Sequence, residues 1–240
     1  MDELHYAKIT MNIQVAILAG GKGTRLRPLT YRIPKCMVPV HEKPFLSYQM
    51  ELIRSFSTRE VLLLVSYLGK QIEEYYEDGS KLGLKIAYSR EQTPMGTGGA
   101  LKNAEDKLEK EFMVLNGDTF LPIDYVALIE YFHQSDKMGV ITVYENSENI
   151  VPNNVIIGEA NRVLSYDKNN PVKMTHVDAG VMIFKKEVLK IIPRDKECSL
   201  EEEIFDSLIR IGELIAFPTS QRFYDMGSYK GLETIGRILG

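Results

Sequence analysis

The stretch LAGGKGTRLRPLTYRIPK, residues 18–35, contains five basic side chains, three glycines and no acidic residue. Glycines that follow a strand allow backbone N–H groups to approach a phosphate closely. Cations without a neighbouring carboxylate repel one another, and a bound anion relieves that repulsion. The stretch therefore predicts a site for a small polyanion. Its spacing does not fit the P-loop, which needs Gly-Lys-Ser/Thr where this chain has Lys22-Gly23-Thr24. It does not fit the dinucleotide motif either, because that motif ends in glycine or alanine and Leu26 stands there.

A second stretch, Leu115-Asn116-Gly117-Asp118, ends another apolar run. Asn-Gly alone is more typical of a hairpin turn, but a hairpin needs a second strand, and residues 125–133 have a helical pattern. An Asp at the carboxyl end of a parallel strand lies where open α/β sheets bind ligands. A lone Asp in a loop is usually structural, so the functional interpretation of Asp118 depends on a partner elsewhere.

Strand-like and helical segments alternate along the first 145 residues, and this order is typical of a mainly parallel sheet covered by helices. The predicted strands are Ile13–Leu18, Val61–Val65, Leu84–Tyr88, Phe112–Leu115 and Val140–Tyr144, and the predicted helices are Phe45–Phe56, Lys70–Tyr76, Gly98–Leu108 and Tyr125–His133.

The pattern changes after Tyr144. Short strands are predicted at residues 154–158, 163–166 and 177–184, and together they indicate a β-rich insertion or lid beside the main sheet. Ser199 with Glu202 three positions later predicts a capping box that starts a helix through Arg210, and a last helix is expected near residues 232–239.

The composition is that of an ordinary globular protein, with 240 residues and a formal net charge of -4, and it predicts one domain. An acidic protein is not expected to bind nucleic acid generally. Cys36 and Cys198 form no metal or redox motif, and no apolar run could span a bilayer, so we expect a reduced cytoplasmic protein without a membrane contact. A homo-oligomer is left open.

The run from Leu18 to Leu26, with Pro28-Leu29-Thr30 and Pro34-Lys35, resembles the signature of sugar-1-phosphate nucleotidyltransferases. The resemblance covers residues 13–240 and implies an α/β, Rossmann-like (GT-A-like) three-layer sandwich with a mainly parallel mixed sheet and a small β-rich lid. It implies one nucleotidyltransferase domain with a nucleotide-binding part at about 13–145, a sugar-binding insertion at about 146–185, and a C-terminal return. The nucleotide-binding residues that it implies are Leu18, Ala19, Gly20, Gly21, Lys22, Gly23, Thr24, Arg25, Lys35, Glu91, Pro94, Gly96, Thr97 and Gly117.

The same resemblance implies a metal site and a sugar site. Asp118 looks like the first magnesium ligand of the family and Asp225, in Tyr224-Asp225-Met226-Gly227, like the second. Arg25, Lys35, Asp118 and Lys168 are the implied catalytic residues. The implied sugar-binding residues are Asn116, Asn154, Asp167, Lys168, Asp178, Ala179, Gly180 and Glu201. Cys36, Asn154 and Asp167 depart from the residues common in the family, and the last two concern the sugar more than the chemistry.

The implied reaction joins a nucleoside triphosphate to a sugar 1-phosphate with release of pyrophosphate, and Mg²⁺ is the implied cofactor. The form TPMGTGGALK, residues 93–102, with residues 67–69 and 81–88, looks most like D-glycero-α-D-manno-heptose 1-phosphate guanylyltransferases. Uridylyl-, cytidylyl- and thymidylyltransferases for glucose or N-acetylmuramate 1-phosphate are the alternatives. A non-catalytic nucleotide-sensing subunit and a nicotinamide-dependent dehydrogenase are the alternatives from other classes. The first would have lost charged residues that are present here, and the second lacks its third glycine.

Overall fold

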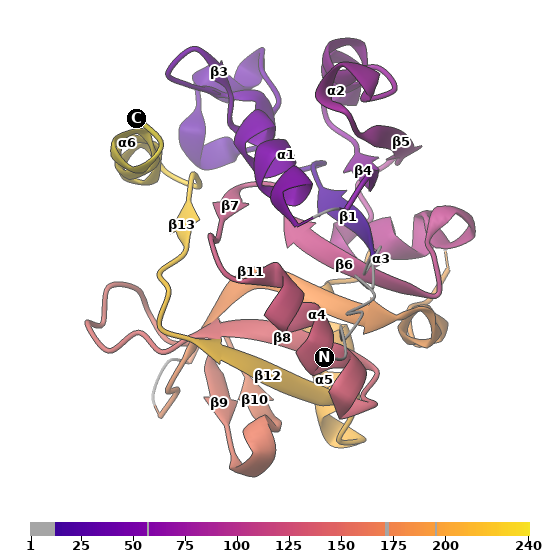
Figure 1. The fold of residues 1–240 in the computed structure, drawn as a ribbon, viewed down its shortest axis with the longest axis vertical. Coiled ribbons are helices and arrows are strands. Elements are labelled where there is room, and N and C mark those ends of the chain that lie inside the picture. The colour runs from indigo at the N-terminus through magenta and orange to yellow at the C-terminus, as the bar shows by residue number, and fades with distance from the viewer. Residues whose placement is uncertain (1–12, 57, 171–172, 195) are drawn as a thin grey trace, which may run out of the picture.

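The computed structural model describes residues 13–240 except 57, 171–172 and 195. Seven strands form the main sheet (Figure 1), and in sequence order they are β1 Gln14–Leu18, β4 Glu60–Val65, β5 Lys85–Arg90, β6 Glu111–Asn116, β8 Gly139–Tyr144, β11 Val177–Lys185 and β12 Leu214–Thr219. In space their order is β12-β8-β11-β6-β1-β4-β5.

The sheet is mixed and mainly parallel, as predicted. Strand β1 pairs in parallel with β4 and β6, β4 with β5, and β8 with β12. Strand β11 runs antiparallel to both of its neighbours, β6 and β8. The prediction that residues 177–184 belong to an insertion beside the sheet is therefore wrong. Their apolar side chains are buried on both faces because β11 is an inner strand.

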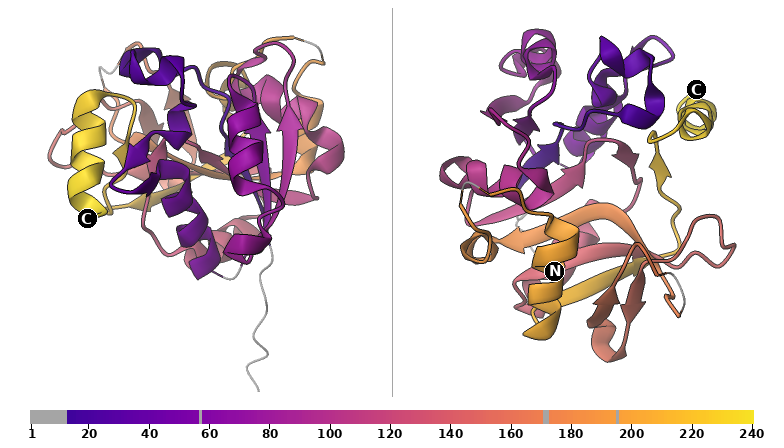
Figure 2. Two further views of the ribbon diagram at one scale, coloured as in Figure 1. Left: turned by 90° about the horizontal axis from the view of Figure 1, so that it is seen from above. Right: turned by 180° about the vertical axis from the view of Figure 1, so that it is seen from behind.

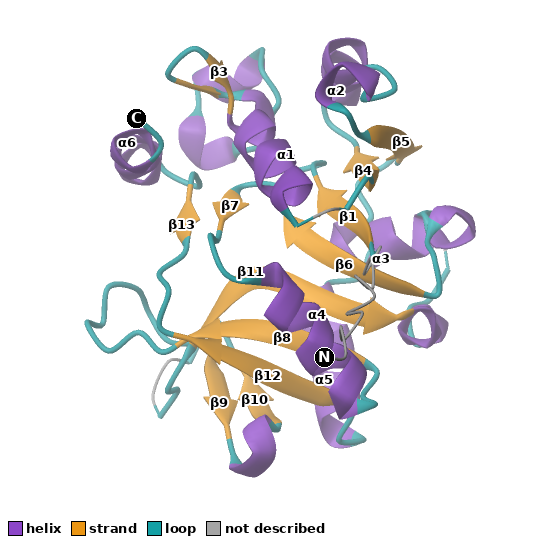
Figure 3. Ribbon diagram, viewed as in Figure 1, coloured by secondary structure: helices purple, strands orange, loops and turns teal. Residues whose placement is uncertain are grey.

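Helices cover both faces and give the predicted three layers, which Figures 2 and 3 show from several sides. Along β1 the side chains alternate, with Val15 and Ile17 in one apolar core and Ala16 in the other. One face carries α1 Phe45–Ser55, α2 Gly69–Tyr76 and α4 Tyr125–Ser135, and the other carries α3 Gly96–Asn103 and α5 Phe205–Arg210.

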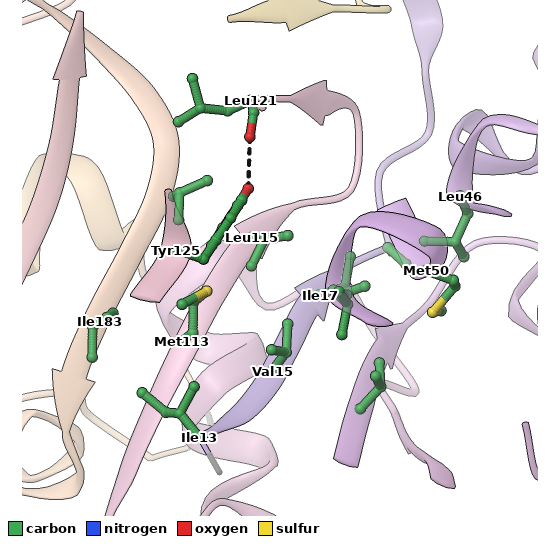
Figure 4. Packing of buried hydrophobic residues seen from close by; sticks show 14 of the residues in the cluster. Ile13, Val15, Ile17, Leu46, Met50, Met113, Leu115, Leu121, Tyr125 and Ile183 are labelled. Atoms are coloured by element: carbon green, nitrogen blue, oxygen red, sulfur yellow. Dashed lines mark hydrogen bonds between the residues drawn. The ribbon is translucent and has the colours of Figure 1, made fainter. Parts of the chain in front are cut away.

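The core on the first face packs side chains of β1 and β6 against α1 and α4 (Figure 4). Tyr125 is buried at the start of α4, and its hydroxyl donates a hydrogen bond of 2.9 Å to the carbonyl oxygen of Leu121. The packing fixes the segment that follows β6, and Asp118 belongs to that segment.

A third, smaller core lies beneath the C-terminal helix α6 Tyr229–Ile238. It joins Leu26 and Val38, which follow β1 in the chain, to Met226 and Ile235 near the C-terminus. The short strands β2 Pro39–Val40 and β3 Lys43–Pro44 form a hairpin there. Another pair, β7 Thr119–Phe120 and β13 Tyr224–Asp225, runs antiparallel. The sequence analysis did not predict these two-residue strands.

The predicted lid consists of two strands only, β9 Val155–Ile157 and β10 Val163–Tyr166, which pair antiparallel outside the main sheet. Helix boundaries also differ from the predictions. Helix α3 ends at Asn103 and a 3₁₀ turn follows it, while α6 begins earlier than predicted, at Tyr229, where Ser228 accepts a hydrogen bond from the N–H of Gly231.

Ser199 caps the next helical segment as predicted, since its Oγ accepts from the N–H of Glu202 at 3.1 Å. In the reciprocal bond, the N–H of Ser199 donates to the carboxylate of Glu203 at 3.0 Å. The prediction that Glu202 is this second capping partner is therefore wrong. The first turn, Leu200–Ile204, is a π-helix. Because a π-helical turn holds more residues than an α-helical one, the side chain that accepts from the N–H of Ser199 is that of the next residue, Glu203.

Candidate nucleotide and sugar phosphate site

A cavity of about 840 Å³ opens where β1, β4 and β6 end. Such an edge, at the carboxyl ends of parallel strands, is the usual ligand position in open α/β sheets. The predicted site residues that line it are Leu18, Ala19, Gly20, Gly21, Lys22, Lys35, Glu91, Pro94, Gly96, Thr97, Asn116, Gly117, Asp118, Lys168 and Glu201.

The glycine loop is held against the Asp118 turn by backbone contacts. The N–H of Gly117 donates to the carbonyl oxygen of Leu18 at 3.1 Å, and a Cβ at Gly117 would stand 2.5 Å from that oxygen. Gly23 has φ of +59°, and a Cβ there would meet Thr30 at 2.8 Å. The hydroxyl of Thr30 is buried and donates to the carbonyl oxygen of Gly23. A backbone oxygen therefore leaves no room for a side chain at Gly117, and the positive φ of Gly23 disfavours a larger residue there.

The loop cations lack carboxylate partners, as the sequence analysis expected. Among the described residues, Lys22, Arg25, Arg27 and Arg32 are exposed and form no ion pair. Lys35 is the exception, because its ammonium group pairs with Oδ2 of Asp118. Lys22 and Lys35 both line the cavity, so its glycine-loop end is positively charged.

Cys36 lines the cavity beside Lys35 and is buried. Burial, together with the nearby charge of Asp118, raises the pKa of its thiol to about 12. A thiol in this state is protonated at neutral pH and is a poor nucleophile. The cavity therefore offers charge and backbone N–H groups for catalysis, and no activated cysteine.

The segment expected to contact the base lies between β5 and α3. Burial raises the pKa of the Glu91 carboxyl above its ordinary value, although a hydrogen bond with Ser66 opposes the shift. Gly96 has φ of +73°, and a Cβ there would stand 2.5 Å from the carbonyl oxygen of Cys198. The N–H groups of Gly98 and Gly99 donate to that same oxygen. The start of α3 is thus fixed on the 198–200 segment.

Glu201 and Lys168 also line the cavity, on segments that come later in the chain. Glu201 is 8% exposed, and its carboxylate accepts from the hydroxyl of Thr97 at 2.6 Å and from Nζ of Lys168 at 3.4 Å. Burial acts to raise the pKa of Glu201, but the charge of Lys168 and the hydrogen bond from Thr97 outweigh it and the pKa is lowered. The Glu201 carboxyl therefore stays ionised at neutral pH.

Asp178, Asn154 and Gly180 do not line the cavity. Asp178 accepts from the hydroxyl of Tyr166 at 3.1 Å and from the N–H of Gly180 at 2.9 Å, and Asn154 Oδ1 accepts from the N–H of Asp178 at 2.8 Å. Burial raises the pKa of Asp178. These residues form a partly buried hydrogen-bonded network next to Lys168, whose Nζ lies 5.7 Å from the ring centroid of Tyr166.

Two other predicted sugar-binding residues have local roles in the structure. Oδ1 of Asp167 accepts from the N–H groups of Asn169 and Asn170, and so closes its own turn. The side chain of Ala179 is buried in the core, which leaves only its backbone to face a ligand. Their contact with sugar stays a prediction.

The two candidate metal ligands are neighbours through the β7–β13 pair. Asp225 is paired with Thr119, and the N–H of Met226 donates to the carbonyl oxygen of Asp118 at 2.9 Å. The Asp225 carboxylate faces a second cavity, of about 220 Å³. Its Oδ1 and Nη2 of Arg25 both lie within 2.7 Å of the position that a Cβ at Gly227 would take. Arg25 therefore lies beside Asp225. Three of the predicted nucleotide-binding residues, Gly23, Thr24 and Arg25, do not line the larger cavity.

Two carboxylates on adjoining backbones suit Mg²⁺, which prefers oxygen ligands and usually takes only one or two from protein, with water and substrate phosphate as the others. Across the part of the chain that the structure describes, no group of three His, Cys, Asp or Glu side chains is placed to hold a metal. Asp118 pairs with Lys35 and lines the larger cavity, whereas Asp225 lines the smaller one, so a magnesium ion shared by the two carboxylates stays a prediction.

Ser66, Tyr67, Gln92 and Glu197 also line the cavity, and the sequence analysis did not assign them to the site. Ser66 and Tyr67 follow β4, the strand beside β1, so their position after an inner parallel strand was an available signal. Glu197 comes from the segment that packs on α3, and no local pattern marks it.

The fold and the cavity define an α/β protein with a cavity lined by lysines and carboxylates at the carboxyl edge of its sheet. The profile described as Nucleotidyl transferase matches residues 14–238, and the chain belongs to this family. Mannose-1-phosphate guanylyltransferase of Mycobacterium tuberculosis is 34% identical over 224 residues, which are 91% of this chain and 62% of that protein. D-glycero-alpha-D-manno-heptose 1-phosphate guanylyltransferase of Campylobacter jejuni is 33% identical over 200 residues, 79% of this chain and 84% of that protein.

The fold is also that of a solved relative. The crystal structure of HddC from Yersinia pseudotuberculosis complexed with GMP-PN superposes with a TM-score of 0.81 at 29% identity, covering 95% of this chain and 100% of that chain. In the described part of the chain, no helix combines the length and apolar character needed to cross a bilayer.

The thiols provide a test of the site's chemistry. Because burial raises the pKa of Cys36 to about 12 and that of Cys198 to about 11, both are protonated at pH 8. We expect the folded protein to react with 5,5′-dithiobis(2-nitrobenzoic acid) at least about 100-fold more slowly than the protein in 8 M urea, where thiol pKa values return to about 8.5. A folded-state rate within tenfold of the unfolded rate would contradict the assigned burial.

Proposed function

We propose that this protein transfers a nucleoside monophosphate from a nucleoside triphosphate to a sugar 1-phosphate. GTP is the proposed donor and D-glycero-α-D-manno-heptose 1-phosphate the proposed acceptor. The observation that carries the proposal is that one cavity is lined both by the glycine loop with Lys22 and Lys35 and by the pair of Lys168 and Glu201. One end suits a triphosphate and the other a phosphorylated sugar.

In the proposed reaction an oxygen of the sugar phosphate attacks the α-phosphorus of the triphosphate. A new P–O bond forms, the bond from the α-phosphorus to the bridging oxygen breaks, and pyrophosphate leaves with that electron pair. The attacking phosphate is already anionic, so no protein base is needed. Holding the two reactants in this geometry supplies about 7–11 kcal/mol, and each well-placed charge about 3 kcal/mol more.

Each charged residue has a role that follows from its place. Lys35 and Lys168 approach the reacting phosphates from different segments of the cavity lining, and Arg25 serves the leaving pyrophosphate from beside Asp225. Asp118 and Asp225 would hold Mg²⁺, which when bound neutralises phosphate charge. Glu201 keeps Lys168 in place through its ion pair.

The choice of GTP is supported by the two guanylyltransferases to which the chain is similar and by the relative solved with GMP-PN. Pyrophosphate release from GTP, UTP, CTP and dTTP, each with a panel of sugar 1-phosphates, tests it. We expect the highest kcat/KM for GTP with the heptose 1-phosphate. A higher value for UTP, CTP or dTTP would replace the base, and release from no pair would refute transferase activity.

Replacement of the candidate metal ligands tests the roles of the two aspartates. Asp118→Asn and Asp225→Asn each remove one anionic ligand, and we expect kcat to fall by about 100-fold or more. Asp106→Asn is the matched control, because Asp106 is exposed and precedes β6 at the opposite end of that strand. The midpoint of urea unfolding should stay close to that of the unaltered protein for all three. Near-normal turnover of either site variant would remove that residue from the metal site.

Lys168 is tested by its effect on the two substrates separately. Lys168→Ala deletes a charged contact, so we expect the KM for the sugar 1-phosphate to rise by about tenfold while the KM for GTP changes little. Lys173→Ala, an exposed lysine in the same loop, is the control and should leave both values unchanged. An equal rise in both KM values would assign Lys168 to general structure.

A further inference from the structure

Gln49 occupies an unusual position on α1. It is fully buried, and its neighbours on the buried side of that helix are Leu46, Met50 and Ile53. An apolar side chain is the usual occupant of such a position, because burying an amide is costly unless it is hydrogen-bonded. Its polar group therefore calls for a specific explanation.

The amide of Gln49 binds the turn that carries Asp118. Its Nε2 donates to the carbonyl oxygen of Asn116 at 2.9 Å and to that of Thr119 at 2.7 Å. Both partners are carbonyl oxygens, which only accept hydrogen bonds, so the NH₂ group of the amide must face the turn and its oxygen must point away. Its Oε1 is buried and has no hydrogen-bond partner among the described residues. The side chain thus uses both of its donors on this one turn and leaves its acceptor unsatisfied.

The two carbonyls that Gln49 holds lie on either side of Gly117 and Asp118. The rest of the turn is fixed from other elements, since the N–H of Gly117 donates to Leu18 and the carbonyl oxygen of Asp118 accepts from Met226. From these contacts we infer that Gln49 is a positioning residue, which holds the Asp118 turn so that its carboxylate faces the cavity. This inference rests on the proposed function for what Asp118 does.

Two variants of Gln49 separate positioning from general packing. Gln49→Met keeps a side chain of similar shape and removes both donors. Gln49→Glu also keeps the shape and, when ionised, places an acceptor against two carbonyl oxygens. Ser47→Ala is the matched control on the same helix, because the hydroxyl of the buried Ser47 contacts that of Tyr76 at 2.9 Å, and among the described residues it forms no hydrogen bond with a site residue.

The test measures kcat, the Mg²⁺ concentration for half-maximal activity, KM for the sugar 1-phosphate and the unfolding midpoint in urea. For Gln49→Met and Gln49→Glu we expect kcat to fall about tenfold or more and half-saturating Mg²⁺ to rise severalfold, with KM for the sugar phosphate within about twofold. Ser47→Ala should lower the unfolding midpoint and leave kcat and Mg²⁺ dependence within about twofold.

A second readout does not need turnover. Binding of Mn²⁺ in the presence of GTP, followed by electron paramagnetic resonance, should weaken severalfold in Gln49→Met and stay unchanged in Ser47→Ala. Unchanged kcat and Mn²⁺ binding in a folded Gln49→Met would overturn the inference. If that variant does not fold, Gln49→Leu, which also removes both donors, decides by the same criteria. Failure of the unaltered protein to release pyrophosphate would instead refute the proposed function.

Discussion

The contact between the backbones of Leu18 and Gly117 is the constraint on which the candidate site depends. In the parallel pairing of β1 and β6, Leu18 stands opposite Asn116, so both chains leave the sheet at the same point. The Gly117 N–H then reaches the Leu18 carbonyl, and the 2.5 Å available for a Cβ excludes every other residue type. Two segments almost 100 residues apart are thereby combined into one site.

Charge is distributed differently among the basic residues of the site. The exposed cations of the glycine loop are unpaired within the described residues, whereas Lys35 and Lys168 each contact a carboxylate. The side chain of Lys35 is 15% exposed, so its ion pair with Asp118 offsets the cost of burying its charge, whereas the side chain of Lys168 is 47% exposed and remains in contact with water.

The sequence predicted the alternating elements well because the inner strands and their covering helices have long, regular apolar patterns. It failed for β11, since an apolar run does not reveal which strands it will pair with, and for β7 and β13, which are too short to show a period. Motif order located most cavity residues. Gln49 was missed because one polar residue in a helix pattern resembles a surface position, and only its partners across the fold show otherwise.

Thr97 links the two halves of the cavity through a single hydroxyl. Its Oγ1 accepts from the N–H of Leu200 and donates to the carboxylate of Glu201, which in turn holds Lys168. Thr97 itself lies in the first turn of α3, in the segment expected to face the nucleotide base. Because a hydroxyl can donate and accept at once, this residue joins the base segment to the Lys168–Glu201 pair without a charge of its own. A shift of α3 would therefore be transmitted to Lys168, so the spacing between the first turn of α3 and the Lys168–Glu201 pair is set by contacts across the fold rather than by either loop alone.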